Sequence, residues 1–377
     1  MTQPTARAVA FNDLRAAHAE VRAELDACWA DALEHASFIG GAAVEQFERS
    51  FADACGIDNA VGVGNGTDAL QLVLEALGIG RGSEVIVPAN TFIATAEAVA
   101  RTGAQPVFVD VSPDSLLISP DAVRAALSAR TAAVIAVHLY GQLADMAALQ
   151  RLCRHAGVAL IEDAAQAHGA RRDGLGPGAR SAAATFSFYP GKNLGALGDG
   201  GAVLTGDRGL ADAVRMLANH GRGGHDGDHA VIGTNSRLDA LQAAVLSVKL
   251  RRLDTWNERR RQVHAWYREL LPAGARATAI EAGNVAVHHL EVARVPRRDE
   301  VRGRMLAAGI ATGVHYPVPC HRTGAFRRPG ADGASCPVAE DAAARVLSLP
   351  MHPFLTRDDV ALTCDALAAA LEPAVRP

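Results

Sequence analysis

Apolar and polar residues alternate with two different periods along the chain. In the first fifty residues, apolar positions such as Val21, Leu25 and Trp29 fall four apart, which predicts helices. From about residue 60, short apolar runs are each followed by an amphipathic stretch, which predicts a mostly parallel sheet with helices on both faces. The expected strands are 60–63, 84–88, 106–110, 132–137, 158–161, 184–188 and 201–205, and the expected helices are 68–77, 94–101, 120–127 and 145–155.

The order of elements changes in the last third of the chain. A long helical stretch is followed by a strand, a helix, a strand, a loop and a last helix, at about 238–271, 285–292, 298–308, 312–316 and 357–371. We therefore expect an α/β protein with a large domain over residues 1–250, which includes the N-terminal helices, and a smaller α/β domain over residues 251–377. No Gly/Ser linker separates the two parts, so we expect them to pack closely.

Composition narrows the class of protein. The 377 residues are 49% hydrophobic and 21% charged, as in ordinary globular proteins, and the net charge of −4 argues against a nucleic-acid partner. No apolar run reaches the ~18 residues of a membrane span, and no signal peptide is expected. The six cysteines are scattered without a C-x-x-C pair, which indicates reduced thiols and a cytoplasmic location. The 36 glycines predict tight turns and close backbone approach to a ligand.

A metal site has little support in the sequence. His225 and His229 have the spacing H-x3-H, but they lie in a stretch of glycine and aspartate that is typical of a solvated loop. We therefore expect no metal.

One glycine loop follows an expected strand and precedes an expected helix. Gly64, Gly66 and Thr67 belong to a G-x-G-x-x-A sequence, which also occurs in dinucleotide-binding enzymes. A dinucleotide site needs an acidic residue at the end of the next strand, and here Glu84 stands at its start. Backbone N–H groups at a helix N-terminus still suit a single phosphate. The structural alternative is a glycine turn with a threonine cap.

A carboxylate and a lysine complete a possible cofactor site. Asp163 lies at the carboxyl end of a buried strand, where ligands of parallel sheets collect. Lys192 follows a Pro-Gly turn in a segment with few charges. A helix cap and a surface lysine are the simpler interpretations. Taken with the phosphate loop, however, the pair predicts pyridoxal 5′-phosphate, whose ring nitrogen needs a carboxylate and whose aldehyde needs an amine.

Four segments resemble those of the DegT/DnrJ/EryC1/StrS sugar aminotransferases. They are 66–70 (GTDAL), 162–169 (EDAAQAHG), 187–192 (SFYPGK) and 235–244 (NSRLDALQAA). The resemblance runs in order from about residue 10 to the end of the chain. It implies the type I (aspartate aminotransferase-like) fold of pyridoxal-phosphate-dependent transferases, and a homodimer with active sites shared at the subunit interface.

The resemblance also implies a role for each matching residue. Lys192 is the Schiff-base lysine, Asp163 pairs with the pyridine nitrogen, and Gln166 lies by the phenolic oxygen. The remaining cofactor contacts are Gly66, Thr67 and Ser187 at the phosphate, Phe92 stacked on the ring, and Asn235 reaching the phosphate from the other subunit. Arg237 is a candidate for the donor's carboxylate, since a guanidinium suits a bidentate partner. The simpler roles are a core aromatic for Phe92, a helix cap for Asn235 and an interface salt bridge for Arg237.

The presence of Lys192 favours transamination, because the family's dehydratases have histidine at that position. The resemblance implies that L-glutamate supplies an amino group to a keto group of a nucleotide-linked ketosugar. Segments 139–145, 188–195 and 315–321 resemble the branch of the family that aminates C3 of 3-keto nucleotide sugars. The resemblance makes Tyr189, His315, Tyr316 and His321 candidate sugar contacts, and a structural loop is the simpler interpretation of 315–321.

Several alternatives remain open. Both dTDP- and UDP-linked sugars fit the sequence, and segment 222–229 matches neither subgroup well. Amination at C4 of an NDP-4-keto-6-deoxysugar, or amination of a ketocyclitol, is the alternative within enzymes. A PLP-binding regulatory protein without turnover is the alternative from another class.

Overall fold

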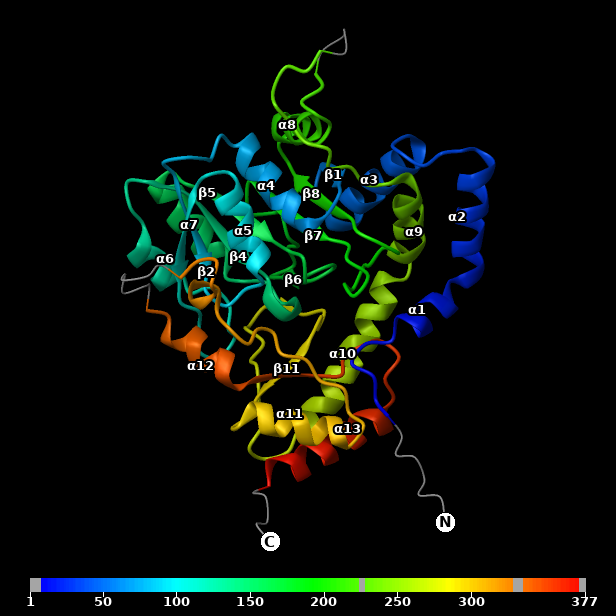
Figure 1. Cartoon of the computed structure of the whole chain (residues 1–377), viewed down its shortest axis with the longest axis vertical. Helices are drawn as coiled ribbons and strands as arrows, with labels where there is room; N and C mark the ends of the chain where they lie inside the picture. The colour runs from blue at the N-terminus through cyan, green and yellow to red at the C-terminus, as the bar shows by residue number, and fades with distance from the viewer. Residues whose placement is uncertain (1–7, 224–227, 328–334, 373–377) are drawn as a thin grey trace.

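The computed structural model describes residues 8–223, 228–327 and 335–372. A seven-stranded sheet lies in the upper part of Figure 1, in the order β1-β8-β7-β5-β4-β2-β3. The strands from β7 to β3 are parallel, whereas β8 is antiparallel to both its neighbours, so the predicted mostly parallel sheet is confirmed. The strands are β1 (Asn59–Val63), β2 (Glu84–Pro88), β3 (Gln105–Val109), β4 (Thr131–Val137), β5 (Ala159–Asp163), β7 (Ala183–Ser187) and β8 (Gly201–Thr205).

Successive strand residues point to opposite faces, and each face is covered by helices. Val85 and Val87 pack with the helices of one layer, whereas Ile86 packs with the helices of the other. The first layer consists of α4 (Gly66–Ala76), α5 (Ile93–Arg101) and α8 (Arg208–Ala218). The second consists of α6 (Pro120–Ala126) and α7 (Met146–Ala156), with α3 (Ala42–Cys55) and α9 (Ala240–Leu250) under β1, β7 and β8.

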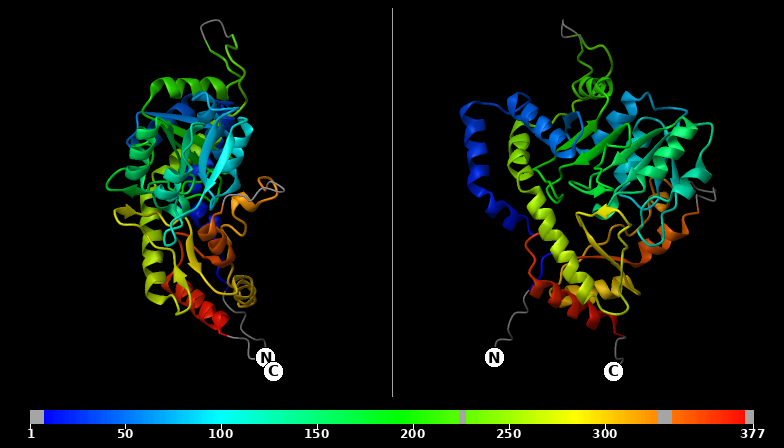
Figure 2. Two further views of the ribbon diagram at one scale, coloured as in Figure 1. Left: turned by 90° about the vertical axis from the view of Figure 1, so that its left-hand side faces the viewer. Right: turned by 180° about the vertical axis from the view of Figure 1, so that it is seen from behind.

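The C-terminal part forms a smaller layered unit below the large sheet (Figure 1). Its antiparallel sheet, in the order β12-β11-β9, packs on three helices. Figure 2 shows α9 and α10 following one another from the large sheet to this unit. The elements are α10 (Leu253–Leu270), β9 (Arg276–Ala277), β11 (Glu291–Arg294), α11 (Arg298–Ala307), η2 (Cys320–Arg322), α12 (Pro337–Arg345), β12 (Val346–Leu349) and α13 (Arg357–Leu371).

The remaining elements connect these parts. Helices α1 (Leu14–Glu20) and α2 (Arg22–Glu34) pack through Val21 and Leu25 on α9 and α10. The turn η1 (Leu139–Gly141) follows β4, and β6 (Arg171–Arg172) pairs with β10 (Asn284–Val285). No helix among the described residues is both long and apolar enough to cross a membrane.

Three predicted elements differ in the structure. The helix predicted over 238–271 is two helices that separate at Arg251, where neither proline nor glycine signals the break. The strand predicted over 285–292 is two short strands. The strand predicted over 312–316 is a single bridge between Gly313 and Ser348, because β12 occupies the edge of the small sheet instead. The domain boundary at residue 250 stays a prediction, although α9 ends there.

Candidate active site

The predicted phosphate loop lies where β1 leads into α4. Gly66 and Thr67 are the first two residues of α4, so their backbone N–H groups have no acceptor within the helix. Asn65 caps the helix by accepting a hydrogen bond from the Asp68 amide at 2.8 Å. A Cβ on Gly66 would lie 2.8 Å from the Ser187 Cβ. The structure therefore brings Gly66, Thr67 and Ser187 together, and only glycine allows this approach.

The segment that contains Asn235 is fixed beside this loop. Ser236 Oγ donates to Asp68 Oδ2 at 2.7 Å and accepts from the Gly64 amide at 3.0 Å. Its neighbours Asn235 and Arg237 are exposed, and Arg237 donates to Asn219 at 3.2 Å. Neither exposed side chain contacts the lysine or the carboxylate of its own chain, so their predicted roles depend on a second subunit.

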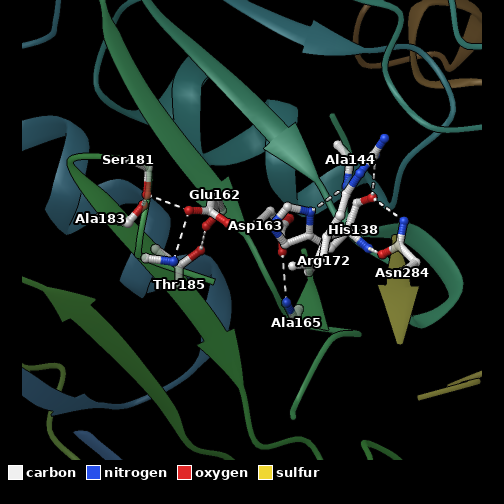
Figure 3. Close-up of polar contacts among 12 residues, drawn as sticks. His138, Ala144, Glu162, Asp163, Ala165, Arg172, Ser181, Ala183, Thr185 and Asn284 are labelled. Carbon is white, nitrogen blue, oxygen red and sulfur yellow. Dashed lines mark hydrogen bonds and ion pairs between the residues drawn. The ribbon is translucent and has the colours of Figure 1, made fainter. Parts of the chain in front are cut away.

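Asp163 ends β5 as a buried carboxylate with two neutral donors. Its Oδ2 accepts a 2.7 Å hydrogen bond from Thr95 Oγ1. Its Oδ1 accepts from the Ala165 amide at 3.2 Å, as Figure 3 shows. Thr91 in turn contacts Thr95 at 2.9 Å. No cation among the described residues forms an ion pair with Asp163. The carboxylate therefore keeps acceptor capacity for a positively charged ligand group.

Lys192 lies in the loop after β7, near enough to this carboxylate to be influenced by its charge. Among the described residues, none forms a hydrogen bond or ion pair with its ammonium group. Burial lowers the pKa of Lys192 to about 8, and the attraction of Asp163 opposes this change. A lysine with this pKa is a much better nucleophile at neutral pH than an ordinary lysine.

The histidines around Lys192 are neutral at pH 7. Burial and the nearby lysine lower the pKa of His168 to about 3 and of His315 to about 4, and they also lower the pKa of His289. The histidines therefore add no positive charge beside Lys192 and Asp163, which interact electrostatically.

A second set of side chains connects Gln166 to the C-terminal part. Gln166 Oε1 accepts from the Tyr140 amide at 2.7 Å, and its Nε2 donates to the Tyr316 hydroxyl at 3.2 Å. The Tyr140 hydroxyl donates to the His315 carbonyl at 2.5 Å. The Phe92 ring lies 5.6 Å from the Tyr316 ring, between centroids. Predicted cofactor and sugar contacts thus meet in one place.

Two predicted sugar contacts lie apart from this group. His321 is buried, and its Nε2 contacts Glu340 of α12 at 2.9 Å. Tyr189 is 61% exposed beside Lys192. Of segment 222–229, residues 224–227 lie outside the described residues, and His229 Nδ1 contacts the His220 carbonyl at 2.7 Å. Nothing in the geometry of one chain assigns a ligand to these side chains.

The sequence did not indicate the role of Glu162, the neighbour of Asp163. Its side chain is fully buried and accepts a hydrogen bond from Gly178 N at 2.8 Å. It also accepts from Ser181 Oγ (2.6 Å) and His138 Nε2 (2.5 Å), two residues that lie beside it in Figure 3. Because the Ala144 amide donates to His138 Nδ1, the histidine proton resides on Nε2. This network fixes the carboxyl ends of β4 and β5. His138, which directly follows β4, was the residue in the sequence that could have indicated this network.

One group of possible metal ligands lies outside the site. His264, His288 and Glu291 have ligand atoms within 4.8 Å of one another. The two imidazoles are stacked, however, with centroids 3.9 Å apart and an interplanar angle of 15°. A metal ion lies in the plane of each imidazole that binds it, so these stacked rings do not direct both lone pairs to one ion.

Comparison with known proteins gives a consistent result. A family model described as the DegT/DnrJ/EryC1/StrS aminotransferase family matches residues 20–368. The chain is 48% identical to dTDP-3-amino-3,4,6-trideoxy-alpha-D-glucose transaminase of Streptomyces venezuelae, over 95% of both chains. It is 41% identical to UDP-2-acetamido-2-deoxy-3-oxo-D-glucuronate aminotransferase of Pseudomonas aeruginosa, over 95% of this chain and 99% of the relative.

A solved structure is equally similar. The crystal structure of S. venezuelae DesV in complex with a ketimine intermediate superposes with a TM-score of 0.93 and 47% sequence identity. The superposition covers 97% of this chain and 99% of that chain.

Proposed function

We propose that this chain, which belongs to the DegT/DnrJ/EryC1/StrS aminotransferase family and uses pyridoxal 5′-phosphate, transfers the amino group of L-glutamate to C3 of a nucleotide-linked ketosugar. The observation that carries the proposal is the pair formed by Lys192 and Asp163. The lysine has a lowered pKa and no hydrogen-bond partner among the described residues, and it faces a carboxylate held only by neutral donors.

The residues present fit the cofactor. The unpaired N–H groups of Gly66 and Thr67 at the start of α4, with Ser187 in contact, suit its phosphate. Asp163 suits the pyridine nitrogen, and Thr95 orients the carboxylate. Gln166 suits the phenolic oxygen, and the exposed Phe92 ring suits a face of the pyridine. When bound, the cofactor supplies an aldehyde that reacts with amines and a ring that accepts electrons.

Lys192 would perform two tasks with one side chain. Its amine would bond to the cofactor and then, once released by the donor amino acid, hold and move the proton at the reacting carbon. A pKa of about 8 suits both tasks, because the two protonation states are then close in free energy at neutral pH. Burial by the neutral histidines excludes water from this proton transfer.

The acceptor's sugar would lie against the segment that contains His315 and Tyr316. Tyr316 contacts Gln166 and Phe92, so this segment borders the expected position of the cofactor ring. Tyr189 and Arg237 are exposed at the rim, available to the nucleotide or to the donor carboxylate. His321 contacts Glu340 in this chain, and its part in sugar binding is the weakest of these assignments. The 48% identity to a dTDP-sugar transaminase supports a dTDP-linked substrate over a UDP-linked one.

A homodimer with shared sites would bring Asn235 to the phosphate of the other subunit. Exposed apolar side chains, among them Trp29, Phe38 and Ile39, support an interface between two subunits. Mixing Lys192→Ala and Asn235→Ala subunits tests this role. Half of the sites in mixed dimers would be intact, so about a quarter of wild-type activity should return. If Asn235 acts within its own chain, no activity returns.

A substrate panel tests the proposed function. The purified protein should be yellow with pyridoxal phosphate, and L-glutamate should shift the spectrum to the amine form. Glutamate-dependent amination of 3-keto and 4-keto dTDP- and UDP-sugars should then be fastest with a 3-keto dTDP-sugar. Faster amination of a 4-keto sugar would favour the C4 alternative. A spectral shift without product from any sugar would favour a regulatory protein.

We also propose a cytoplasmic location, which the six free cysteines support.

A further inference from the structure

Lysine is rare in this chain, and its two lysines meet at one loop. Of the 37 basic residues, only Lys192 and Lys249 are not arginine. Lys192 belongs to the loop between Phe188 and Ala196, and Lys249 of α9 donates to the Gly195 carbonyl of the same loop at 2.6 Å. An ammonium group is a compact donor, whereas a guanidinium is a wide, planar one. Lys249 therefore places a compact cation against the loop that contains Lys192.

The environment of Lys249 is that of a structural donor. Its side chain is 3% exposed, and its second polar contact is His18 Nε2 at 3.2 Å. Burial lowers the pKa of Lys249 to about 8, and none of the described carboxylates forms an ion pair with it. A buried cation with only these partners is costly. The hydrogen bond to the Gly195 carbonyl is the interaction that offsets this cost.

Asn257 of α10 contacts two segments of the site at once. Its Oδ1 accepts from Asn193 Nδ2 at 2.9 Å, one residue after Lys192. Its Nδ2 donates at 2.8 Å to the carbonyl of His168, two residues after Gln166. The side chain is 2% exposed. One buried amide thus connects the lysine loop to the segment after Asp163.

The amide of Asn193 completes this network. Besides the contact with Asn257, its Nδ2 donates to the Val287 carbonyl at 2.9 Å, and its Oδ1 accepts from His289 Nδ1 at 3.0 Å. Both donors and one acceptor position are therefore used inside the protein. The ends of the loop are also closed, because the Ala196 amide donates to the Phe188 carbonyl at 2.8 Å.

We infer that Lys249 and Asn257 are positioning residues, which hold the loop in place so that the Lys192 amine stays near Asp163. The inference rests on the proposed function for what Lys192 does, but its first test needs no cofactor. Loosening either contact would let the lysine turn towards water. Its pKa would then rise towards 10.5, and the amine would leave its position for proton transfer.

The first test measures Lys192 in the cofactor-free protein. Acetic anhydride labelling over a pH series, with peptide mass spectrometry, gives the midpoint of lysine deprotonation. In Lys249→Met the assignment is unambiguous, because Lys192 is then the sole lysine. We expect the midpoint to rise by about one pH unit in Lys249→Met and in Asn257→Ala, so that the reactive fraction at pH 8 falls about fivefold.

Two variants serve as matched controls. Arg298→Met removes a buried cation that donates to the Ala343 and Val346 carbonyls and to the exposed Asp299, away from the loop. Asn59→Ala removes an amide that donates to the Thr205 carbonyl at the sheet edge. Both should lower the midpoint of thermal unfolding and leave the Lys192 titration unchanged. If Asn257→Ala fails to fold, Asn193→Ala removes the same contact from the loop side.

The second test uses the protein loaded with pyridoxal phosphate. We expect kcat to fall by roughly 10- to 100-fold in Lys249→Met and Asn257→Ala, with KM changed less than about threefold, and the pH midpoint of the bound chromophore to shift. Unchanged labelling, chromophore and kcat in variants that only lose stability would overturn the inference. A wild-type protein that binds no pyridoxal phosphate would overturn the proposed function instead, while the labelling result would still decide the positioning role.

Discussion

Replacing Lys192 by methionine should stabilise the cofactor-free protein. The side chain is partly removed from water without a hydrogen bond or ion pair from any described residue, and burial lowers the pKa of Lys192 from 10.5 to about 8. At about 1.4 kcal/mol for each pH unit, this corresponds to about 3 kcal/mol of stability lost to keep a charged lysine there. Lys192 is only half-buried, so we expect Lys192→Met to raise the free energy of unfolding by roughly 1–3 kcal/mol at pH 7.

The sign of the pH dependence follows from the direction of the pKa change. Below about pH 8 both the folded and the unfolded lysine are protonated, and the full cost is present. Between pH 8 and 10.5 only the unfolded chain keeps the proton, so wild-type stability rises with pH. The part of the Lys192→Met stability gain that comes from removing the charge therefore shrinks over this interval and vanishes above it.

Urea unfolding at fixed protein concentration, at pH 7 and at pH 10.5, measures this effect. The packing of methionine contributes equally at both values, so the difference between the two stability changes isolates the charge. The same stability change at both pH values, or a smaller gain at pH 7 than at pH 10.5, would refute the argument that the charged Lys192 destabilises the fold.

Three further predictions concern the same site. Asp163→Asn keeps the side-chain volume but removes the charge, and we expect kcat to fall by roughly 10²–10³-fold in the transamination assay; near wild-type turnover would contradict the assigned role. Gly66→Ala brings a Cβ within 2.8 Å of the Ser187 Cβ, so fluorescence titration should show cofactor affinity weakened about tenfold, whereas Gly206→Ala meets nothing within 4 Å and should bind normally. Glu162→Ala removes the acceptor of two buried donors, Gly178 N and His138 Nε2, whereas Ser181 keeps the Ala183 carbonyl as an acceptor; the substitution should cost roughly 2–4 kcal/mol in urea unfolding, and a loss below about 1 kcal/mol would show that the network is dispensable.

The sequence predicted most of the large sheet because its elements alternate with clear periods. Its seven strands and the helices between them lie within one or two residues of the predicted ranges. The C-terminal part was harder to predict, since its strands are only two to four residues long. Strand β12 begins directly after α12, and no proline or glycine separates them. Short edge strands are defined by pairing between distant segments, and periodicity does not report such pairing.

In the site, residues in contiguous motifs were easier to find than those that act across the fold. Asp163 ends β5 and Lys192 follows β7. These two strands are parallel neighbours, so their carboxyl ends lie at the same edge of the sheet. Thr95 and Tyr140 were missed, although both contact predicted residues directly. Thr95 lies inside a helix and Tyr140 in a short turn with a φ of 63°, and neither position carries a chemical pattern along the chain. Their contribution depends on three-dimensional contacts between segments that are far apart in sequence.

The two adjacent carboxylates of β5 have different tasks. Glu162 stabilises the fold, and Asp163 keeps acceptor capacity for a ligand. Successive side chains point to opposite faces, so Glu162 and Asp163 face different environments. Glu162 accepts three hydrogen bonds in a fully buried position, and its acceptor capacity is used within the fold. Asp163 accepts two, remains 8% exposed and faces Lys192. Exchanging the two roles would require a register shift of one residue, which would also move Ile161 from its own core cluster to the opposite face of the sheet. The packing of β5 therefore fixes which of the two carboxylates is left free to bind a ligand.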